Sequence, residues 1–201
     1  MENTEFFEKY QTWWSNRTPD EDKLYGNILE YEEEYFEDMT FQPGSVCYET
    51  VSFIIDNFDF FSLEIEYFYF RYYVKELKDG TSGICDLKER TITISPKYKD
   101  DRSVILHEMI HAYEYILVNE NPVLCELMLI MLYNKLKPSI PNLDELIKDH
   151  TELYGQHCIA ATGGQHGILF YLKSLDLDLR CGYNLGKVCG YGRENGEMWY
   201  F

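Results

Sequence analysis

Two histidines and a glutamate near the middle of the chain have the spacing of a metal site. His107, Glu108 and His111 form an H-E-x-x-H motif. On a helix, residues i and i+4 differ by about 40° around the axis, so the two imidazoles point the same way, one turn apart. Zinc needs neutral imidazole nitrogens about 2 Å away in a roughly tetrahedral array. Glu108 lies about 100° round from His107, close enough to reach a water at the metal without being a ligand.

Such a set supports zinc-dependent hydrolysis, in which the metal acidifies a water and polarises a carbonyl while a carboxylate takes the proton. The alternative is that His107 and His111 are ordinary helix residues and Glu108 is a surface acid. The residues "VIL" before the motif and "MI" inside it are apolar and predict a buried helix. Two histidines and a glutamate are costly to bury without a partner, which favours the metal site.

A third ligand is needed, and the sequence offers several. The metzincin extension of the motif is excluded because Glu114 and Leu117 occupy the places of its glycine and histidine. Four acidic or histidine side chains further along the chain remain as candidates, namely Glu126, His150, His157 and His166.

The four candidates differ in their surroundings. Glu126 lies on the next predicted helix, where zincins with a glutamate ligand place theirs, although it is also a lone acid on an apolar helix. His150 and His157 lie seven apart on a polar helix and are predicted to face solvent. His166 follows two glycines and precedes an apolar helix, so it is predicted to sit near a helix start and to face the core.

The predicted helices and strands that must position these residues indicate an α+β fold. The motif helix is predicted from about Asp101 to Val118, with Asp101 or Ser103 as its cap. Three strands precede it, at Ser62–Leu77, in "ICDL" and in "TITIS", and tight turns between them predict an antiparallel meander. We expect a small antiparallel sheet packed on the motif helix.

Helices are predicted on both sides of this centre from apolar periodicity and from breaks at proline and glycine. The expected helices are 3–14, 20–39, 44–58, 122–136, 143–157 and 165–178. The tail after residue 179 is rich in glycine and aromatic residues and is predicted to form hairpins or loops. Cys181 and Cys189 lie there in matching C-G-Y triplets, and turn geometry is favoured over a disulfide or half a metal site.

Three stretches taken together resemble the SprT-like family of zinc metallopeptidases. They are "SGICDLKERTITISP", "SVILHEMIHAYEY" and "GGQHGILFYLKSLDLD". In that family a short strand precedes H-E-M-x-H-A, and an H-G-x-x-F element supplies the third histidine. The resemblance covers about residues 83–178.

The resemblance implies a zincin-like fold, one Zn2+ bound by His107, His111 and His166, and Glu108 as the catalytic acid and base. It implies a hydrolase that cleaves protein or peptide substrates. The chain departs from the family in the long segment 112–165 between the second and third histidines, and no zinc ribbon follows. The rival prediction is a catalytically silent zinc-binding scaffold that holds a partner with its acidic helices.

Charge limits the partners of the 201-residue chain, whose formal net charge is −17. Residues 1–70 carry 3 basic and 17 acidic side chains. Such a surface repels phosphate backbones, so direct nucleic-acid binding is disfavoured and a basic protein partner is predicted. The sequence shows no signal peptide and no apolar run long enough to span a bilayer. We expect a cytoplasmic single domain, with an acidic helical part at 1–60 and the metallopeptidase part at 61–201.

Overall fold

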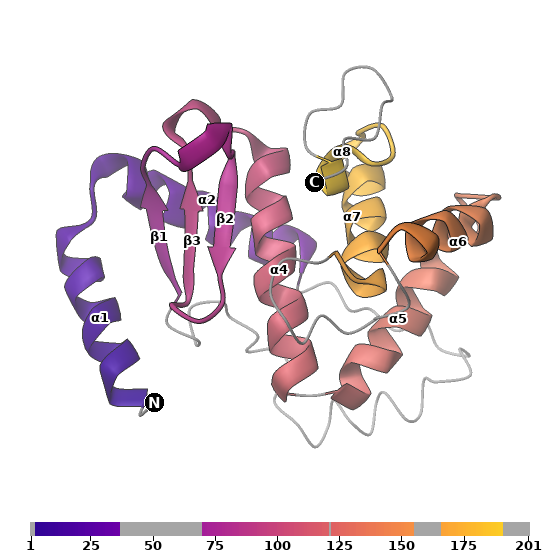
Figure 1. Ribbon diagram of the computed structural model, residues 1–201, viewed down its shortest axis with the longest axis horizontal. Helices are drawn as coiled ribbons and strands as arrows, with labels where there is room; N and C mark the ends of the chain where they lie inside the picture. The colour runs from indigo at the N-terminus through magenta and orange to yellow at the C-terminus, as the bar shows by residue number, and fades with distance from the viewer. Residues whose placement is uncertain (1–2, 37–69, 121, 155–165, 191–201) are drawn as a thin grey trace. The chain divides into compact units, whose positions relative to one another are not determined.

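The computed structural model describes residues 3–36, 70–120, 122–154 and 166–190 (Figure 1). The chain divides into two compact units, Met1–Asp100 and Asp101–Phe201. The described part of the first unit holds two α-helices, two short 3-10 helices and a three-stranded sheet, and that of the second holds helices alone. The fold is therefore mixed α+β and mostly helical, as predicted. The single-domain organisation and the packing of the sheet on the motif helix stay predictions.

The first unit begins with α1 (Asn3–Asn16) and α2 (Pro19–Tyr35), which confirms the first two predicted helices. A capping box starts α2. The Thr18 hydroxyl accepts a hydrogen bond from the Glu21 amide at 3.2 Å, and the Glu21 carboxylate accepts one from the Thr18 amide at 2.9 Å. These two bonds satisfy donors that the first helical turn leaves unpaired. The predicted helix at 44–58 lies outside the described residues.

The sheet of the first unit is mixed, which corrects the prediction of an antiparallel meander. It contains β1 (Arg71–Val74), β2 (Gly83–Asp86) and β3 (Thr91–Ile94) in the order β1-β3-β2. β2 pairs antiparallel with β3, as predicted, whereas β1 runs parallel to β3. The part of the first predicted strand before residue 70 lies outside the described residues.

Burial explains why β3 takes the central position. Ile92 and Ile94 are completely buried, whereas Ile84 of β2 is 44% exposed. The segment 75–82, which includes the short 3-10 helix η3 (Lys78–Gly80), joins β1 to β2 and is long enough to pass one strand. The tight turn at 87–90 then returns β3 between them. The most buried of the three strands thus has a neighbour on both sides.

Helix α1 lies alongside β1, at the edge of the sheet (Figure 1). The indole N–H of Trp13 donates a hydrogen bond to the carbonyl oxygen of Tyr72 at 2.9 Å. The Trp13 ring also meets the rings of Tyr72 and Tyr25 edge-on, at centroid distances of 5.5 and 6.0 Å. Because a free strand edge can pair with another chain, this contact both satisfies a backbone acceptor and shields the edge.

The second unit contains α4 (Arg102–Glu120), α5 (Pro122–Leu136), α6 (Leu143–Tyr154), α7 (Ile168–Cys181) and α8 (Lys187–Gly190). The first four confirm predicted helices. In the tail, α7 ends at Gly182, which has a left-handed backbone with φ 68° and closes the helix, and a turn then leads into the short α8. The described tail is thus a turn and a helical turn, with no hairpin. Residues 191–201 lie outside the description.

Helix α4 is buried on nearly all sides along its first three turns. From Val104 to Ile110 no residue is more than 3% exposed. Asp101 caps the helix, as predicted, because its carboxylate accepts hydrogen bonds from the Ser103 amide at 2.9 Å and from the Ser103 hydroxyl at 2.7 Å. Helices α5, α7 and α8 all contact α4. The apolar residues of α4 lie all round the helix, which suits this enclosed position, and its buried polar residues His107, Glu108 and Glu114 need partners there.

A buried ion pair within α7 also contacts a lysine of α5. Lys173 lies 3.2 Å from Asp176 one turn along α7, and the same carboxylate lies 2.7 Å from Lys135 of α5. Burial lowers the pKa of Lys173 to about 8, and Asp176 opposes that effect. Lys173 and Asp176 compensate each other, since either alone would leave a buried charge unpaired, and the half-exposed Lys135 links this pair to α5.

None of the helices in the described segments is both long enough and apolar enough to cross a membrane. Cys85, Cys125, Cys181 and Cys189, the described cysteines, are thiols rather than disulfides. Cys181 is the last residue of α7 and Cys189 lies in α8. The two cysteines thus form no disulfide with each other, but they lie in helices rather than in the predicted turns.

Candidate metal centre

Three histidines meet in the second unit. His107 and His111 come from α4, and His166 comes from the segment that leads into α7. The ring centroids lie 5.0 Å apart for His107 and His111, 4.9 Å for His107 and His166, and 5.2 Å for His111 and His166. One ring nitrogen of each lies within 4.8 Å of the others, which is close enough for one metal ion to contact all three.

Phe170 forms an apolar wall beside the three imidazoles. This residue of α7 is completely buried, and its ring centroid lies 4.8, 4.6 and 4.3 Å from those of His107, His111 and His166. His166 and Phe170 are four residues apart and their rings stack at 18°. Phe170 therefore limits where each imidazole can turn and keeps water away from one side of the cluster.

The tautomer of His107 follows from its hydrogen bond. Its Nδ1 lies 2.9 Å from the carbonyl oxygen of Val188, in α8. A carbonyl can only accept, so Nδ1 must carry the hydrogen, and Nε2 keeps the lone pair that a metal needs. Metal-binding histidines in proteins usually have such a partner on the other ring nitrogen.

All three histidines are held in the neutral form. Burial lowers the pKa of His111 to about 3 and that of His166 to about 4, with smaller contributions from His166 and His150 respectively. Burial also holds the pKa of His107 well below 6.5, aided by its two histidine neighbours. Neutral imidazoles are the form that binds metal, so no proton has to be displaced near pH 7.

The remaining predicted site residues are placed as follows. Glu108 follows His107 on α4 and is only 3% exposed. Glu126 is exposed on α5 and does not belong to the cluster that the described residues form. His150 was expected to face solvent, and this is wrong, because only 6% of it is exposed. His157 lies outside the described residues.

His150 supports the third histidine of the cluster. Its Nε2 lies 2.8 Å from the carbonyl oxygen of His166, and its ring stacks on that of Tyr171 at 4.1 Å. Polarity of the surrounding helix predicted exposure, but α6 packs against α7 and turns this residue inward. His150 follows Leu143 and Ile147 at helical spacing, so it lies on the inward face of α6, where it can donate a hydrogen bond to a neighbouring element.

Glu114 supports the cluster from the other side and was not predicted to do so. It is buried, and its carboxylate accepts a hydrogen bond from the backbone amide of Phe170. Gly167 begins α7 without a side-chain cap, so Glu114 supplies the cap from α4. Burial raises the pKa of Glu114 to about 7. Its position one turn after His111, on the same face, was the available signal.

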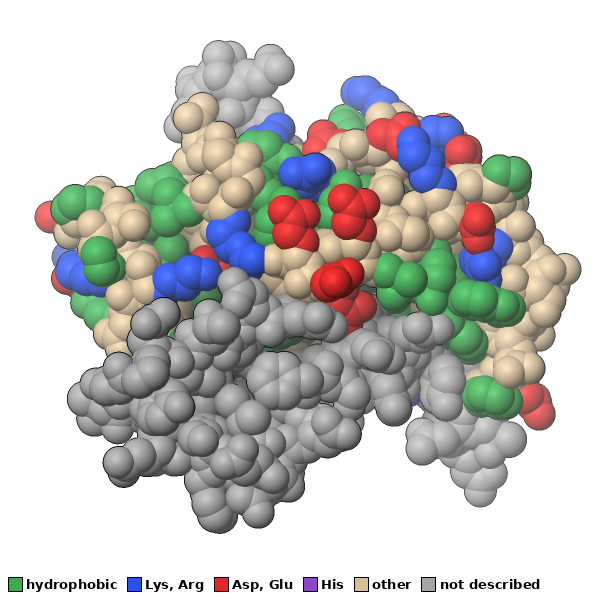
Figure 2. All heavy atoms as spheres, turned by 180° about the vertical axis from the view of Figure 1, so that it is seen from behind, with side chains coloured by type: hydrophobic (Ala, Val, Ile, Leu, Met, Phe, Trp, Pro, Cys, Tyr) green, Lys and Arg blue, Asp and Glu red, His purple; other side chains and the backbone are tan. Residues whose placement is uncertain are grey.

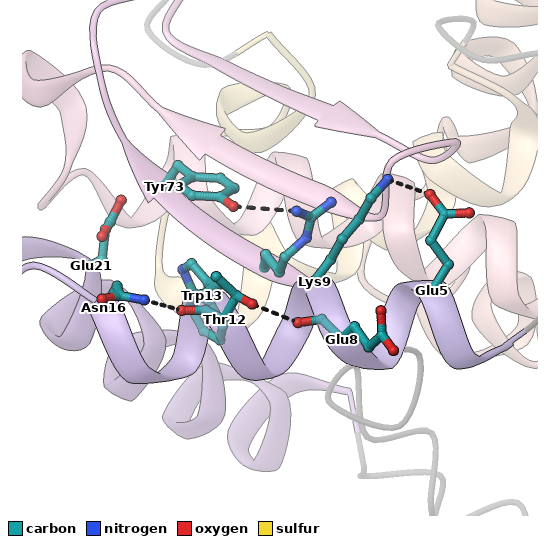
Figure 3. A pocket seen from close by; sticks show the side chains of 9 residues that line it. Glu5, Glu8, Lys9, Thr12, Trp13, Asn16, Glu21 and Tyr73 are labelled. Atoms are coloured by element: carbon teal, nitrogen blue, oxygen red, sulfur yellow. Dashed lines mark hydrogen bonds and ion pairs between the residues drawn. The ribbon is translucent and has the colours of Figure 1, made fainter.

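A separate pocket lies in the first unit, between α1 and β1 (Figure 3). It has a volume of about 670 Å³. Its cations are already engaged, since Lys9 lies 3.1 Å from Glu5 and Arg71 donates to the carbonyl oxygen of Glu89 at 2.8 Å. The pocket has no histidine, and no role in the metal chemistry is assigned to it. The lining residues are Glu5, Glu8, Lys9, Thr12, Trp13, Asn16, Glu21, Arg71 and Tyr73.

Compared with known proteins, the chain matches no protein-family model, no curated protein and no solved structure. The case for a function therefore depends on the residues of this chain and on their arrangement.

Proposed function

We propose that the protein is a zinc metallopeptidase, with Zn2+ held by His107, His111 and His166. The observation that carries the proposal is the cluster of these three neutral histidines, one buried and two half-buried, with one ring nitrogen of each within 4.8 Å of the others. Imidazole nitrogens are favoured zinc ligands. The hydrogen bond at His107 Nδ1 leaves its Nε2 for the metal, and so supports the fit of a zinc ion to these residues.

The number of ligands favours a catalytic site. Structural zinc sites in proteins are usually closed by four protein ligands, whereas catalytic sites have three and leave a position for water or substrate. The cluster formed by the described residues has three. The resemblance to SprT-like metallopeptidases supports the same assignment, and a zincin-like fold belongs to this proposal.

Glu108 would serve as the general base. Zinc, when bound, supplies the positive charge that acidifies a water and polarises a peptide carbonyl. Glu108 takes a proton from the attacking water at a carboxylate oxygen and then passes it to the leaving amine nitrogen. The three histidines would hold the zinc ion in place, and Phe170 excludes water from one side of the cluster. The products are a carboxylate and an amine, so the substrate class is protein or peptide.

The proposal is tested by zinc content together with proteolysis of a denatured general substrate. Glu108→Gln should retain zinc and lose at least about 100-fold in activity, because general-base catalysis typically contributes that much. Glu126→Gln, an exposed glutamate on α5, is the matched control and should behave like wild type. An unchanged rate in Glu108→Gln, or wild-type protein that binds no zinc, would contradict the proposal.

The rival function is a silent zinc-binding scaffold that holds a partner through α2. Three glutamates on that helix are exposed, Glu30, Glu33 and Glu34. A scaffold has no use for a base beside the metal. If zinc-loaded wild type failed to cleave any unfolded protein while Glu108→Gln bound zinc equally well, the scaffold would be the better assignment.

A further inference from the structure

Asp178 is a buried carboxylate of α7 that the proposed chemistry does not use. It is completely buried, and it faces the turn that leads into α8. Oδ2 accepts a hydrogen bond from the Gly186 amide at 2.6 Å, and Oδ1 accepts one from the Val188 amide at 2.9 Å. A carboxylate that is buried this completely must find such donors, since an unpaired one would be costly.

These two hydrogen bonds hold a segment that has little structure of its own. Helix α8 spans only Lys187–Gly190, and a single turn is not stable by itself in water. Gly186 precedes it with a left-handed backbone at φ 88°. The position of this short helix therefore depends on its contacts with α4 and α7, of which Asp178 provides the charged one.

The segment held in this way makes the polar contact with the first histidine of the metal centre. Val188 donates its amide to Asp178 and presents its carbonyl oxygen to His107 Nδ1, at 2.9 Å in each case. Val188 is itself completely buried, so no water replaces either bond. Moving the turn would take the acceptor away from His107. The imidazole could then adopt the other tautomer, with the hydrogen on Nε2, where the metal should bind.

We propose that Asp178 is a positioning residue for the metal centre, acting on His107 through the Val188 carbonyl. The inference rests on the proposed zinc site. It states that Asp178 of α7 controls which ring nitrogen of His107 carries the hydrogen. Asp178 touches neither metal nor substrate in this scheme. Removing a residue that positions a metal ligand typically lowers metal affinity by about 10- to 100-fold.

The direct test is Asp178→Asn, which keeps the size of the side chain. The amide can accept only at Oδ1, and its NH2 group would face a backbone N–H, so at least one hydrogen bond is lost. Zinc affinity, measured by competition with a coloured chelator, should fall roughly 10- to 100-fold. In the metal-free protein at pH 7.5, long-range 1H–15N spectra should show His107 shifting from the Nδ1–H tautomer of wild type toward Nε2–H.

Two controls separate positioning from general destabilisation. Lys173→Met removes from the same helix a buried charge that is paired with Asp176 rather than with the turn before α8, and it should leave zinc affinity and the His107 tautomer unchanged. Asp149→Asn makes the same chemical change at an exposed site of α6. Thermal unfolding of every variant reports how much stability each change costs.

A second variant keeps the inference testable if Asp178→Asn does not fold. Gly186→Ala leaves the carboxylate in place and strains the turn, since alanine disfavours φ 88°, and a methyl group there meets no atom within 4 Å. Gly80→Ala, at φ 74° in the first unit, carries the same strain and is its control. Gly186→Ala should lower zinc affinity, and Gly80→Ala should not.

The results distinguish this inference from the proposed function. If wild type binds zinc and both Asp178→Asn and Gly186→Ala bind it equally tightly, the role of Asp178 is overturned and the zinc site stands. If wild type binds no zinc, the proposed function fails. The tautomer of His107 in the metal-free variants then still decides whether Asp178 positions it.

Discussion

The histidines of the candidate centre are neutral, buried or half-buried rings, and this has a consequence for acid stability. In the folded protein the pKa of His111 is about 3, whereas in an unfolded chain it is about 6.5. Between these two values the unfolded state binds a proton that the folded state does not. The metal-free fold therefore loses stability as the pH falls below about 6.5, and the loss continues down to the folded-state pKa.

We predict that His111→Gln removes the part of this acid sensitivity that the protonation of His111 causes. Between the folded and the unfolded pKa, one such group lowers the free energy of unfolding by about 1.4 kcal/mol for each unit by which the pH falls. Between pH 7.5 and 5, the free energy of unfolding of wild type relative to His111→Gln should fall by about 2 kcal/mol. Urea unfolding of the metal-free proteins at several pH values measures the difference, and a difference that does not vary with pH would contradict the prediction.

At the scale of elements, the third histidine depends on how α4, α6 and α7 meet. His166 precedes α7, His150 of α6 binds its carbonyl oxygen, and Glu114 of α4 caps the helix that follows. The Glu114 Oε1 atom is buried and has no hydrogen-bond partner among the described residues. This carboxyl serves α7 as a cap, but burial raises its pKa to about 7, and the one hydrogen bond from the Phe170 amide only partly opposes that effect.

We predict that Glu114→Gln stabilises the metal-free protein at alkaline pH. Because the folded-state pKa exceeds the unfolded value of 4.5, the wild-type contribution is fully present below pH 4.5 and is lost as the pH rises through 7. Gln keeps an oxygen for the Phe170 amide and carries no charge. Relative to wild type, its free energy of unfolding should rise by up to about 3 kcal/mol between pH 4.5 and 8.

Denaturant unfolding across that range measures the effect of the Glu114 substitution. Glu114→Leu is the informative comparison, because it loses the cap at every pH and should be less stable than Glu114→Gln throughout. A constant difference between Glu114→Gln and wild type would show that the carboxyl does not titrate in this window.

For the whole molecule, the uneven charge is the feature that the metal site does not explain. Figure 2 shows one face on which acidic side chains gather, with lysine and arginine side chains beside them. In the first unit, some acids hold structure together, since Asp20 lies 2.7 Å from Lys99 and Asp100 lies 2.6 Å from Lys23. The exposed glutamates of α2 are better candidates for attracting a basic partner, because long-range attraction needs charges that solvent can reach.

We predict that Glu30→Gln with Glu33→Gln lowers the cleavage of basic unfolded proteins several-fold at low salt. Cleavage of acidic unfolded proteins should not change, and the difference should vanish at high salt, where charges more than a few ångströms apart are screened. Glu126→Gln with Glu145→Gln removes two exposed charges from the second unit and is the control. Point substitutions are preferable to deleting α1 and α2, because Trp13 covers the edge of the sheet.

Equal rates for basic and acidic substrates, insensitive to salt and to these substitutions, would leave α1 and α2 as a covering layer for the sheet. That outcome would not affect the proposed zinc site, which lies wholly in the second unit.

The helices and their ends could be predicted from the sequence, because they depend on residues that are neighbours along the chain. The spacing of His107 and His111 brings two imidazoles to one face of any helix, and the apolar residues between them predict its burial. Caps and breaks at Asp101 and Pro122 placed the helix boundaries well. His166 was singled out by its resemblance to a family element, while residue reasoning alone left four candidates open.

What only the tertiary structure decided depends on residues far apart in sequence. Alternating side chains predict strands, but parallel and antiparallel strands alternate alike, so the direction of β1 relative to β3 needed the three-dimensional pairing. The burial of His150 could have been read from its helical spacing to Leu143 and Ile147, but its bond to the His166 carbonyl oxygen could not. The contacts of Glu114 with Phe170 and of Asp178 with Val188 join elements by single hydrogen bonds, and such bonds leave no periodic pattern in a sequence.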